Sequence, residues 1–304
     1  MSQYDLFYEQ VKKHLAGFNS WGAWRNKGKT YPYIANIEGK NKQAVIREII
    51  KSDKVPTDLY RHPHKDAHHL NSSQVVCYEF FSPMMRINPS NPEIGLADKK
   101  LIRFVKDILG INISENSVCQ FEYEDKETKA LFKSYTQNGI GERSQFDFFI
   151  KDGETEIYFE IKYTEQSFGP WSPSKKPEDQ IKNHCLYVGK GYIPMLINSP
   201  YFTQECKDTL LSFQKDDFAS LQNPFNAQYQ LFRNALKAGK SKYSIFIFPA
   251  ANPNPGKEFE VFEKNLLDGQ SHILALKWEE LKQYMSERFY KKFIDLGASD
   301  AIID

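Results

Sequence analysis

Asp147, Glu160 and Lys162 lie within one short stretch of the chain and have the side-chain types that bind a divalent cation and act on a phosphate group. The stretch spans residues 145–162 and reads QFDFFIKDGETEIYFEIK. Carboxylate oxygens are ligands that magnesium prefers, and a lysine beside a bound cation can position water and offset developing negative charge. This chemistry is available only if the local fold brings the three side chains together.

A β-hairpin turning at Asp152-Gly153 would bring them together. Asp-Gly is a strong signal for a two-residue turn, because a type I′ turn needs positive φ at both central positions and these residue types tolerate it. With this loop, Lys151 pairs with Glu154. Counting back along both strands then sets Asp147 opposite Tyr158.

The alternation of side chains along a strand decides which residues share a face. One face holds Asp147, Tyr158, Glu160 and Lys162, and the other holds Ile157, Phe159 and Ile161. Asp147 and Glu160 are then diagonal neighbours with Cβ atoms about 7 Å apart, close enough to share one cation. Alternating polar residues are also typical of a solvated face. Against that alternative, residues 146–150 are apolar apart from Asp147, so burial would make an uncompensated carboxylate costly.

In these residues the chain resembles the PD-(D/E)XK nuclease superfamily. The resemblance consists of Asp147 on one strand and Glu160-Ile161-Lys162 as the E-x-K element on the next, with Phe146 where the proline of the motif stands. It implies that Asp147 and Glu160 bind magnesium and that the backbone carbonyl of Ile161 adds a ligand. It also implies that Lys162 orients or activates water.

The superfamily has an αβββαβ core, and the flanking sequence supplies the remaining elements. Before the hairpin, residues 74–81 and 95–109 predict helices, and residues 118–123 alternate as a strand. After it, residues 224–238 predict a helix and residues 243–248 a buried strand. We therefore expect an α/β protein with a restriction-endonuclease-like αβββαβ core, in which helices cover both faces of a mixed central sheet.

Further site residues are implied by the same resemblance. An acid on the first core helix often joins the metal site in this superfamily, and Glu79 is the acid in the predicted helix 74–81, although a lone glutamate on a short helix is often at the surface. The later helix usually presents Gln, Arg or Tyr to the site or the nucleic acid. Its matching residues are Gln228, Tyr229 and Arg233.

Two other segments have the composition of nucleic-acid contacts. The Pro- and Ser-rich loop of residues 164–178 follows the strand that carries Lys162, and it contains Trp171, Lys175 and Lys176. Residues 11–51 carry nine Lys or Arg and two Glu, a net charge of +7 in a chain whose overall charge is +1. Their aromatic residues could stack on bases or pack internally, and their cations could contact phosphates or form a solvated surface.

Composition fits an ordinary globular protein of 304 residues. No apolar stretch approaches the roughly 20 residues that span a bilayer, no signal peptide is evident, and the four scattered cysteines form no C-x-x-C. We expect a cytoplasmic protein with reduced thiols. Its expected parts are a basic N-terminal region (1–69), the nuclease-like core (70–250) and a C-terminal elaboration of the same domain (251–304).

The sequence thus favours a nuclease that uses Mg²⁺, with Mn²⁺ as a possible substitute, to hydrolyse phosphodiester bonds, most readily in DNA. A second hypothesis is a nuclease-like fold retained without cleavage as a module that binds nucleic acid or protein. Asp147, Glu160 and Lys162 are all present, which argues for the enzyme. The oligomeric state is left open by the sequence.

Overall fold

The computed structural model describes most of the chain. The described residues are 1–41, 44, 48–49, 68–91, 94–133, 145–171, 178, 181–182, 185, 187–212 and 223–297. Lys175 and Lys176 lie outside these ranges, so their predicted contacts with nucleic acid stay predictions.

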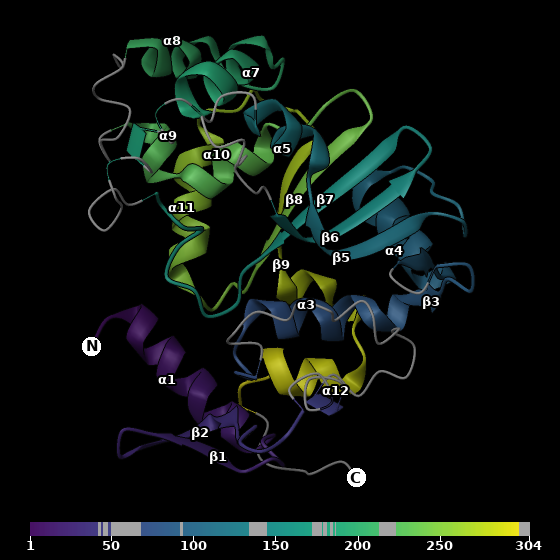
Figure 1. Ribbon diagram of the computed structural model, residues 1–304, viewed down its shortest axis with the longest axis vertical. Coiled ribbons are helices and arrows are strands. Elements are labelled where there is room, and N and C mark those ends of the chain that lie inside the picture. Colours follow the sequence, from purple (N-terminus) through teal and green to yellow (C-terminus); the bar gives the residue numbers. More distant parts are fainter. Residues whose placement is uncertain are drawn as a thin grey trace.

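A seven-stranded mixed sheet forms the centre of the molecule (Figure 1). Its strands, in spatial order, are β3 (Met85–Ile87), β4 (Gly95–Ala97), β5 (Val118–Glu124), β6 (Gln145–Asp152), β7 (Thr155–Ile161), β8 (Lys242–Phe248) and β9 (Ile273–Lys277). Neighbours from β3 to β7 are antiparallel, whereas β7, β8 and β9 run parallel. The three central strands are joined as a meander, and the chain then crosses over through helices to the parallel strand β8. This confirms the predicted mixed sheet and is compatible with a restriction-endonuclease-like core.

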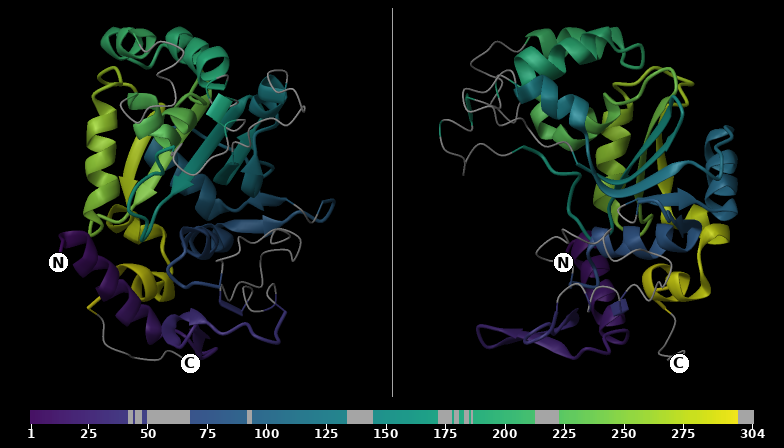
Figure 2. Two further views of the ribbon diagram at one scale, coloured as in Figure 1. Left: turned by 60° about the vertical axis from the view of Figure 1, so that its left-hand side comes forward. Right: turned by 45° about the vertical axis from the view of Figure 1, so that its right-hand side comes forward.

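Two hydrophobic clusters cover the two faces of the sheet. The alternation along β8 shows this directly, because Ile245 and Ile247 belong to one cluster and Phe246 and Phe248 to the other. The first face packs against α3 (Ser73–Phe81), α4 (Lys99–Leu109), η6 (Trp278–Tyr284), α12 (Glu287–Phe289) and η7 (Tyr290–Ile294). The second packs against η4 (Tyr187–Tyr192), α7 (Ile193–Asn198), α8 (Gln204–Ser212), α9 (Pro224–Ala227), α10 (Tyr229–Ala235) and α11 (Pro253–Glu263), as Figures 1 and 2 show.

The prediction for the apolar face of β7 is confirmed. Ile157, Phe159 and Ile161 are fully buried in the first cluster. Phe81 of α3 stacks on Phe148 of β6 with ring centroids 4.0 Å apart. Burying a side chain of this size contributes roughly 1.5–3 kcal/mol, so α3 is held firmly against the strands that carry the candidate site.

The predicted helix 95–109 is partly wrong. Its first residues form strand β4, and the helix begins only after Asp98, whose side chain accepts a hydrogen bond from the Lys100 amide (3.3 Å). Gly95 lies so close to β3 that a Cβ there would sit 2.1 Å from Cε of Met85. Pairing with β3 and β5 therefore outweighs the local helical pattern at the start of this segment.

Two other predicted helices need smaller changes. The helix 74–81 is confirmed as α3. The helix 224–238 is interrupted at Gln228, whose φ of −120° and ψ of 40° are not helical, so the segment forms two short helices, α9 and α10.

The N-terminal residues form α1 (Gln3–Ala16) and a separate hairpin of β1 (Ala23–Asn26) and β2 (Lys29–Ala35). Ser2 begins α1 with a capping box. Phe7, Val11 and Leu15 on the buried face of α1 join the first hydrophobic cluster. The N-terminal region is thus packed onto the core through α1, and the hairpin extends from it (Figure 2).

All four cysteines are free, as expected. Within the described ranges, no helix combines the length and the apolar character that crossing a membrane requires. The cytoplasmic location expected from the sequence stays a prediction.

The contacts of Glu156, near the start of β7, predict that the stability of the protein depends on pH. Burial alone would raise the pKa of this carboxyl, but hydrogen bonds from Lys151 (2.7 Å), Tyr158 (2.6 Å) and the Lys242 ammonium outweigh it and lower the pKa from 4.5 to about 2. A lowered folded-state pKa contributes stability above the unfolded value, and this contribution is lost as pH falls from about 4.5 to about 2. In urea unfolding, the free energy of unfolding of Glu156→Gln should fall less over that pH interval than that of the wild type. Glu154→Gln, an exposed neighbour, should behave like the wild type.

Candidate active site

The hairpin that carries the candidate residues turns one position later than the sequence suggested. Asp152 pairs with Thr155 and Lys151 with Glu156, so the loop is Gly153-Glu154. The prediction of an Asp152-Gly153 loop is therefore wrong. Asp152 is held in the strand because its carboxylate accepts hydrogen bonds from the amide (2.8 Å) and the hydroxyl (3.0 Å) of Ser114, a contact made far away in the sequence.

The observed turn shifts the register of β6 against β7 by two residues from the predicted one. A shift of two residues leaves every side chain on its predicted face. Phe148 pairs with Phe159, and continuing the ladder by one step puts Asp147 directly opposite Glu160 rather than Tyr158. The amide of Ile161 donates a hydrogen bond of 2.6 Å to Oδ2 of Asp147. The two predicted metal ligands are thus direct neighbours across the strands, and Ile161 lies beside them.

Glu122 on β5 brings a third carboxylate to the same row, and sequence reasoning missed it. Phe121 pairs with Phe148 and Tyr123 with Phe146, which places Glu122 beside Asp147. Glu122 has a positive φ of 50°, which is uncommon for a residue other than glycine and alters the strand locally. The alternating pattern of the strand was visible in the sequence, but its register against β6 was not.

The three carboxylates repel one another in a buried setting. Burial and the charges of Glu160 and Glu122 raise the pKa of Asp147 well above its usual range. Burial, with the charge of Glu160, likewise raises the pKa of Glu122 to about 7. A cluster of this kind prefers to hold protons or a cation, because like charges at close range disfavour ionisation.

Lys162 brings a positive charge to this row. Burial acts to lower the pKa of Lys162, but the carboxylates of Glu160, Glu165 and Asp147 outweigh it, so the pKa is raised and the ammonium stays charged. Its Nζ lies 2.9 Å from Oε1 of Glu160 and 2.8 Å from Oε1 of Gln230. The lysine is therefore held in one position rather than free to move.

Two residues of α10 complete this contact network. Gln230 accepts the hydrogen bond from Lys162, and Nδ2 of Asn234 donates to Oε2 of Glu160 (2.7 Å). Residues four apart on a helix share a face, so one side of α10 contacts both ends of the E-x-K element. The sequence predicts the helix that carries Gln230 and Asn234 but not their contacts, although their spacing of four residues is a signal for a shared face.

The three residues of this segment that the sequence predicts as nucleic-acid contacts make other contacts in the structure. Gln228, Tyr229 and Arg233 each expose 9% or less of their surface. Nε2 of Gln228 donates to the carbonyl of Glu258 (3.0 Å), and the guanidinium of Arg233 lies over the ring of Tyr229 (5.5 Å). These side chains pack inside the helical layer, and their contact with nucleic acid stays a prediction.

Glu79 also lies away from the candidate site. Its carboxylate forms an ion pair with buried Lys292 and lies 3.9 Å from the guanidinium of Arg288. Its contacts therefore connect α3 to η7 and α12, and a role of Glu79 in the metal site stays a prediction. Gln74, earlier on the same helix, takes its place beside the acids, because its side chain hydrogen-bonds to Glu122.

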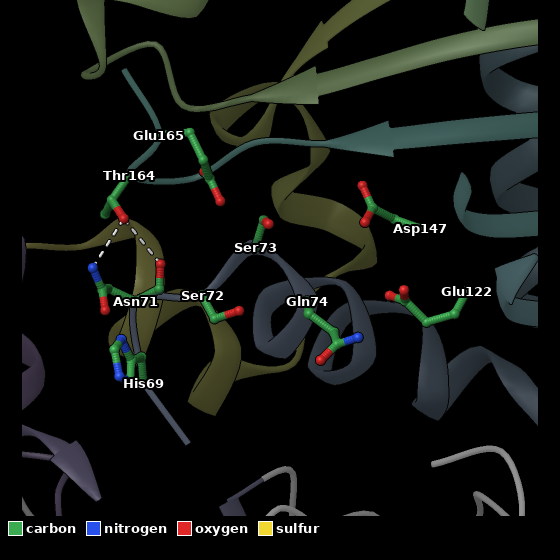
Figure 3. A pocket seen from close by; sticks show the side chains of 9 residues that line it. All are labelled: His69, Asn71, Ser72, Ser73, Gln74, Glu122, Asp147, Thr164 and Glu165. Atoms are coloured by element: carbon green, nitrogen blue, oxygen red, sulfur yellow. Dashed lines mark hydrogen bonds between the residues drawn. The ribbon is translucent and has the colours of Figure 1, made fainter. Parts of the chain in front are cut away.

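A pocket of about 340 Å³ opens at Asp147 and Glu122, two of the three acids of this row (Figure 3). Figure 3 shows the carboxylates of Asp147 and Glu122 directed into the same space, with Gln74 beside them. One wall is fixed by Asn71, whose Nδ2 donates to Oγ1 of Thr164 (3.0 Å). The lining residues are His69, Asn71, Ser72, Ser73, Gln74, Glu122, Asp147, Thr164 and Glu165.

Trp171, which the sequence suggested as a nucleic-acid contact, is half-buried against the second hydrophobic cluster. Its amide donates to the carbonyl of Asn226 (2.9 Å). Its contact with nucleic acid stays a prediction.

The sequence profile of one protein family, described as restriction endonuclease associating with ARP, matches residues 9–295, nearly the whole chain. The chain belongs to this family. The resemblance of Asp147 and Glu160-Ile161-Lys162 to restriction-endonuclease-like nucleases is thereby confirmed. No curated protein and no solved structure matched the chain in the corresponding searches.

The donor set of this family member suits magnesium. Among the described residues, no group of three or more His, Cys, Asp or Glu side chains is arranged to hold a metal ion by itself. Magnesium does not require such a group, because it usually binds through one or two carboxylates and completes its shell with water and substrate phosphate oxygens. The carboxylates of Asp147 and Glu160 fit that mode of binding, and the predicted ligand role of the Ile161 carbonyl stays a prediction.

Proposed function

We propose that this family member is a nuclease that hydrolyses phosphodiester bonds in DNA with Mg²⁺ held by Asp147 and Glu160. The supporting observation is the row of carboxylates on neighbouring strands of a restriction-endonuclease-like sheet, with Lys162 fixed 2.9 Å from Glu160. The raised pKa values of Asp147 and Glu122 mean that their ionised forms cost free energy without a counter-charge, and a bound cation would offset that cost. Mn²⁺ offers the same ligand preferences and is proposed as a substitute.

The residues of the chain would each have a distinct role. The bound cation would polarise the phosphate and lower the pKa of bound water. Asp147 is oriented by the Ile161 amide, and Glu160 is oriented by Asn234, so both carboxylates are set in place before substrate arrives. Lys162, held between Glu160 and Gln230, would position the attacking water and stabilise charge that develops on the phosphate.

The alternative, a module that binds nucleic acid or protein without cleavage, agrees less well with this site. Burying like charges costs free energy, and a binding module would gain stability by replacing them. The family description names an association with ARP, and we carry this association over as a proposed protein partner. Such a partner is compatible with a nuclease and does not replace the proposed activity.

Divalent cations should bind and stabilise the protein. If Mg²⁺ or Mn²⁺ occupies the acidic row, saturating concentrations of about 100 times the Kd should raise the free energy of unfolding by about 2.7 kcal/mol. Calorimetric titration and thermal unfolding measure this, and Ca²⁺ and EDTA serve as comparisons. Absence of any divalent-ion binding at millimolar concentrations would contradict the metal-dependent activity.

Cleavage itself is tested with labelled single- and double-stranded DNA and RNA, each incubated with Mg²⁺, Mn²⁺ or EDTA. Metal-dependent cleavage of DNA that EDTA abolishes is the expected result. Metal binding without cleavage of any of these substrates would favour the non-cleaving module instead.

A further inference from the structure

The hairpin of β1 and β2 is a two-stranded ribbon with an exposed basic end, and the proposed chemistry leaves it unexplained. The two strands form a two-stranded sheet of their own, separate from the central sheet, and among the described residues β2 makes one further isolated antiparallel bridge, Ile34 with His69. All residues from 25 to 30 are exposed. Figure 2 shows the ribbon extending from the body of the molecule, below α3. A segment of this kind contributes little to the hydrophobic core.

The charge of the ribbon end is of one sign. Arg25, Lys27 and Lys29 lie within five residues, and no acidic residue occurs in the sequence between Glu9 and Glu38. The turn is formed by Lys27 and Gly28, whose φ values of 47° and 76° match the two positive φ angles of a type I′ turn. The cations are thus displayed on a regular and stiff turn, where they repel each other unless a polyanion lies against them.

The base of the ribbon is attached to the segment that leads into the pocket. In β2, the amide of Ala35 donates to the carbonyl of His68 (3.0 Å), and the carbonyl of Tyr33 accepts from the amide of Leu70 (3.2 Å). Residues 68–70 run directly into α3, whose first turn lines the pocket. The ribbon is therefore positioned relative to the acidic row by backbone hydrogen bonds.

Aromatic rings connect the ribbon to the same segment. The ring centroid of Trp24 lies 5.4 Å from that of Tyr31 and 6.4 Å from that of His69. His69 lines the pocket that contains Asp147 (Figure 3). The alternation of side chains places Asn26 and Lys29 on the ribbon face that carries Trp24 and Tyr31. This face thus leads from the basic end to the edge of the pocket.

We propose that the β1–β2 ribbon binds double-stranded DNA and holds the duplex in position at the acidic row. A two-stranded antiparallel ribbon fits the major groove, and cations at its end can contact the phosphates that flank the groove. Asn26, on the face that carries Trp24, has the side chain that makes paired hydrogen bonds to adenine, whereas Arg25 on the opposite face can contact a phosphate. This inference rests on the proposed function, and it specifies duplex DNA as the form of the substrate.

The test measures binding separately from cleavage. Affinity for a fluorescein-labelled duplex is measured by anisotropy in EDTA over a series of salt concentrations. The ribbon variant carries Arg25→Gln, Lys27→Gln and Lys29→Gln, and the matched control carries Gln at three exposed lysines on other elements, Lys106, Lys240 and Lys264. Unfolding curves check that both variants remain folded, as expected for exposed positions.

The ribbon variant should lose at least about tenfold in duplex affinity, and its slope of log affinity against log salt should be flatter by up to about 2.7, or 0.9 for each lost phosphate contact. The control should match the wild type. An unchanged affinity and slope in the ribbon variant, or a wild type that binds only single strands, would overturn the proposal. Because cleavage plays no part in this assay, failure of the nuclease proposal is detected separately.

Discussion

Replacing Asp147 with asparagine should abolish metal-dependent cleavage, with a loss of at least about 10³-fold, the upper range for one preorganised electrostatic group. The asparagine retains an oxygen that can accept the hydrogen bond from the Ile161 amide, so the local backbone is preserved. It removes the negative charge that would bind the cation. The increase in thermal stability on adding Mg²⁺ should therefore disappear together with activity.

The same substitution should not destabilise the protein in EDTA. Burial and the charges of Glu160 and Glu122 disfavour the ionised form of Asp147, and asparagine carries no charge at this position, so the melting temperature without metal should stay equal or rise. Asp152→Asn is the matched control, because it makes the same change on the same strand and weakens only the contact with Ser114. If the Asp147→Asn protein cleaves DNA at the wild-type rate, and the Asp152→Asn control is also active, then Asp147 is not part of the active site.

Replacing Lys162 should separate DNA binding from cleavage. Lys162→Ala removes the group proposed to position water but no metal ligand, so cleavage should fall by at least about 10²-fold while duplex affinity and metal binding persist. Lys162→Met keeps more of the aliphatic stem and should give the same separation. Single-turnover cleavage and anisotropy binding measure the two quantities independently.

The stability of the Lys162 variants tests the buried ion pair between Lys162 and Glu160. Their Glu160 carboxylate loses its buried counter-charge, and breaking such a pair typically costs about 3–5 kcal/mol, so unfolding in EDTA should occur at lower denaturant. Added Mg²⁺ should restore part of the lost free energy of unfolding. Lys242→Met is the control, because it breaks an ion pair with Glu156 on the neighbouring parallel strand without touching the pocket. Wild-type cleavage in Lys162→Ala would assign this lysine a purely structural role.

The local sequence determined α3, the hairpin strands and the faces of those strands, whereas pairing with β3 and β5 decided that residues 95–97 form β4. The apolar alternation of β7 required Ile157, Phe159 and Ile161 to share one face, and this left Glu160 and Lys162 on the other. The turn was predicted one position too early, but the predicted faces are still correct, because a register shift of two residues preserves the alternation of side chains. The motif Asp147, Glu160-Ile161-Lys162 likewise identified the family that the profile match confirms.

Tertiary structure decided which other side chains reach this motif. Glu122 joins the row through the register of β5 against β6, and Gln230 and Asn234 reach it through the rotation of α10 about its axis. Glu79 instead faces the C-terminal elements, where Lys292 neutralises it. Registers between distant strands and the rotation of a helix depend on packing across the whole core, and a local pattern of residues does not contain that information.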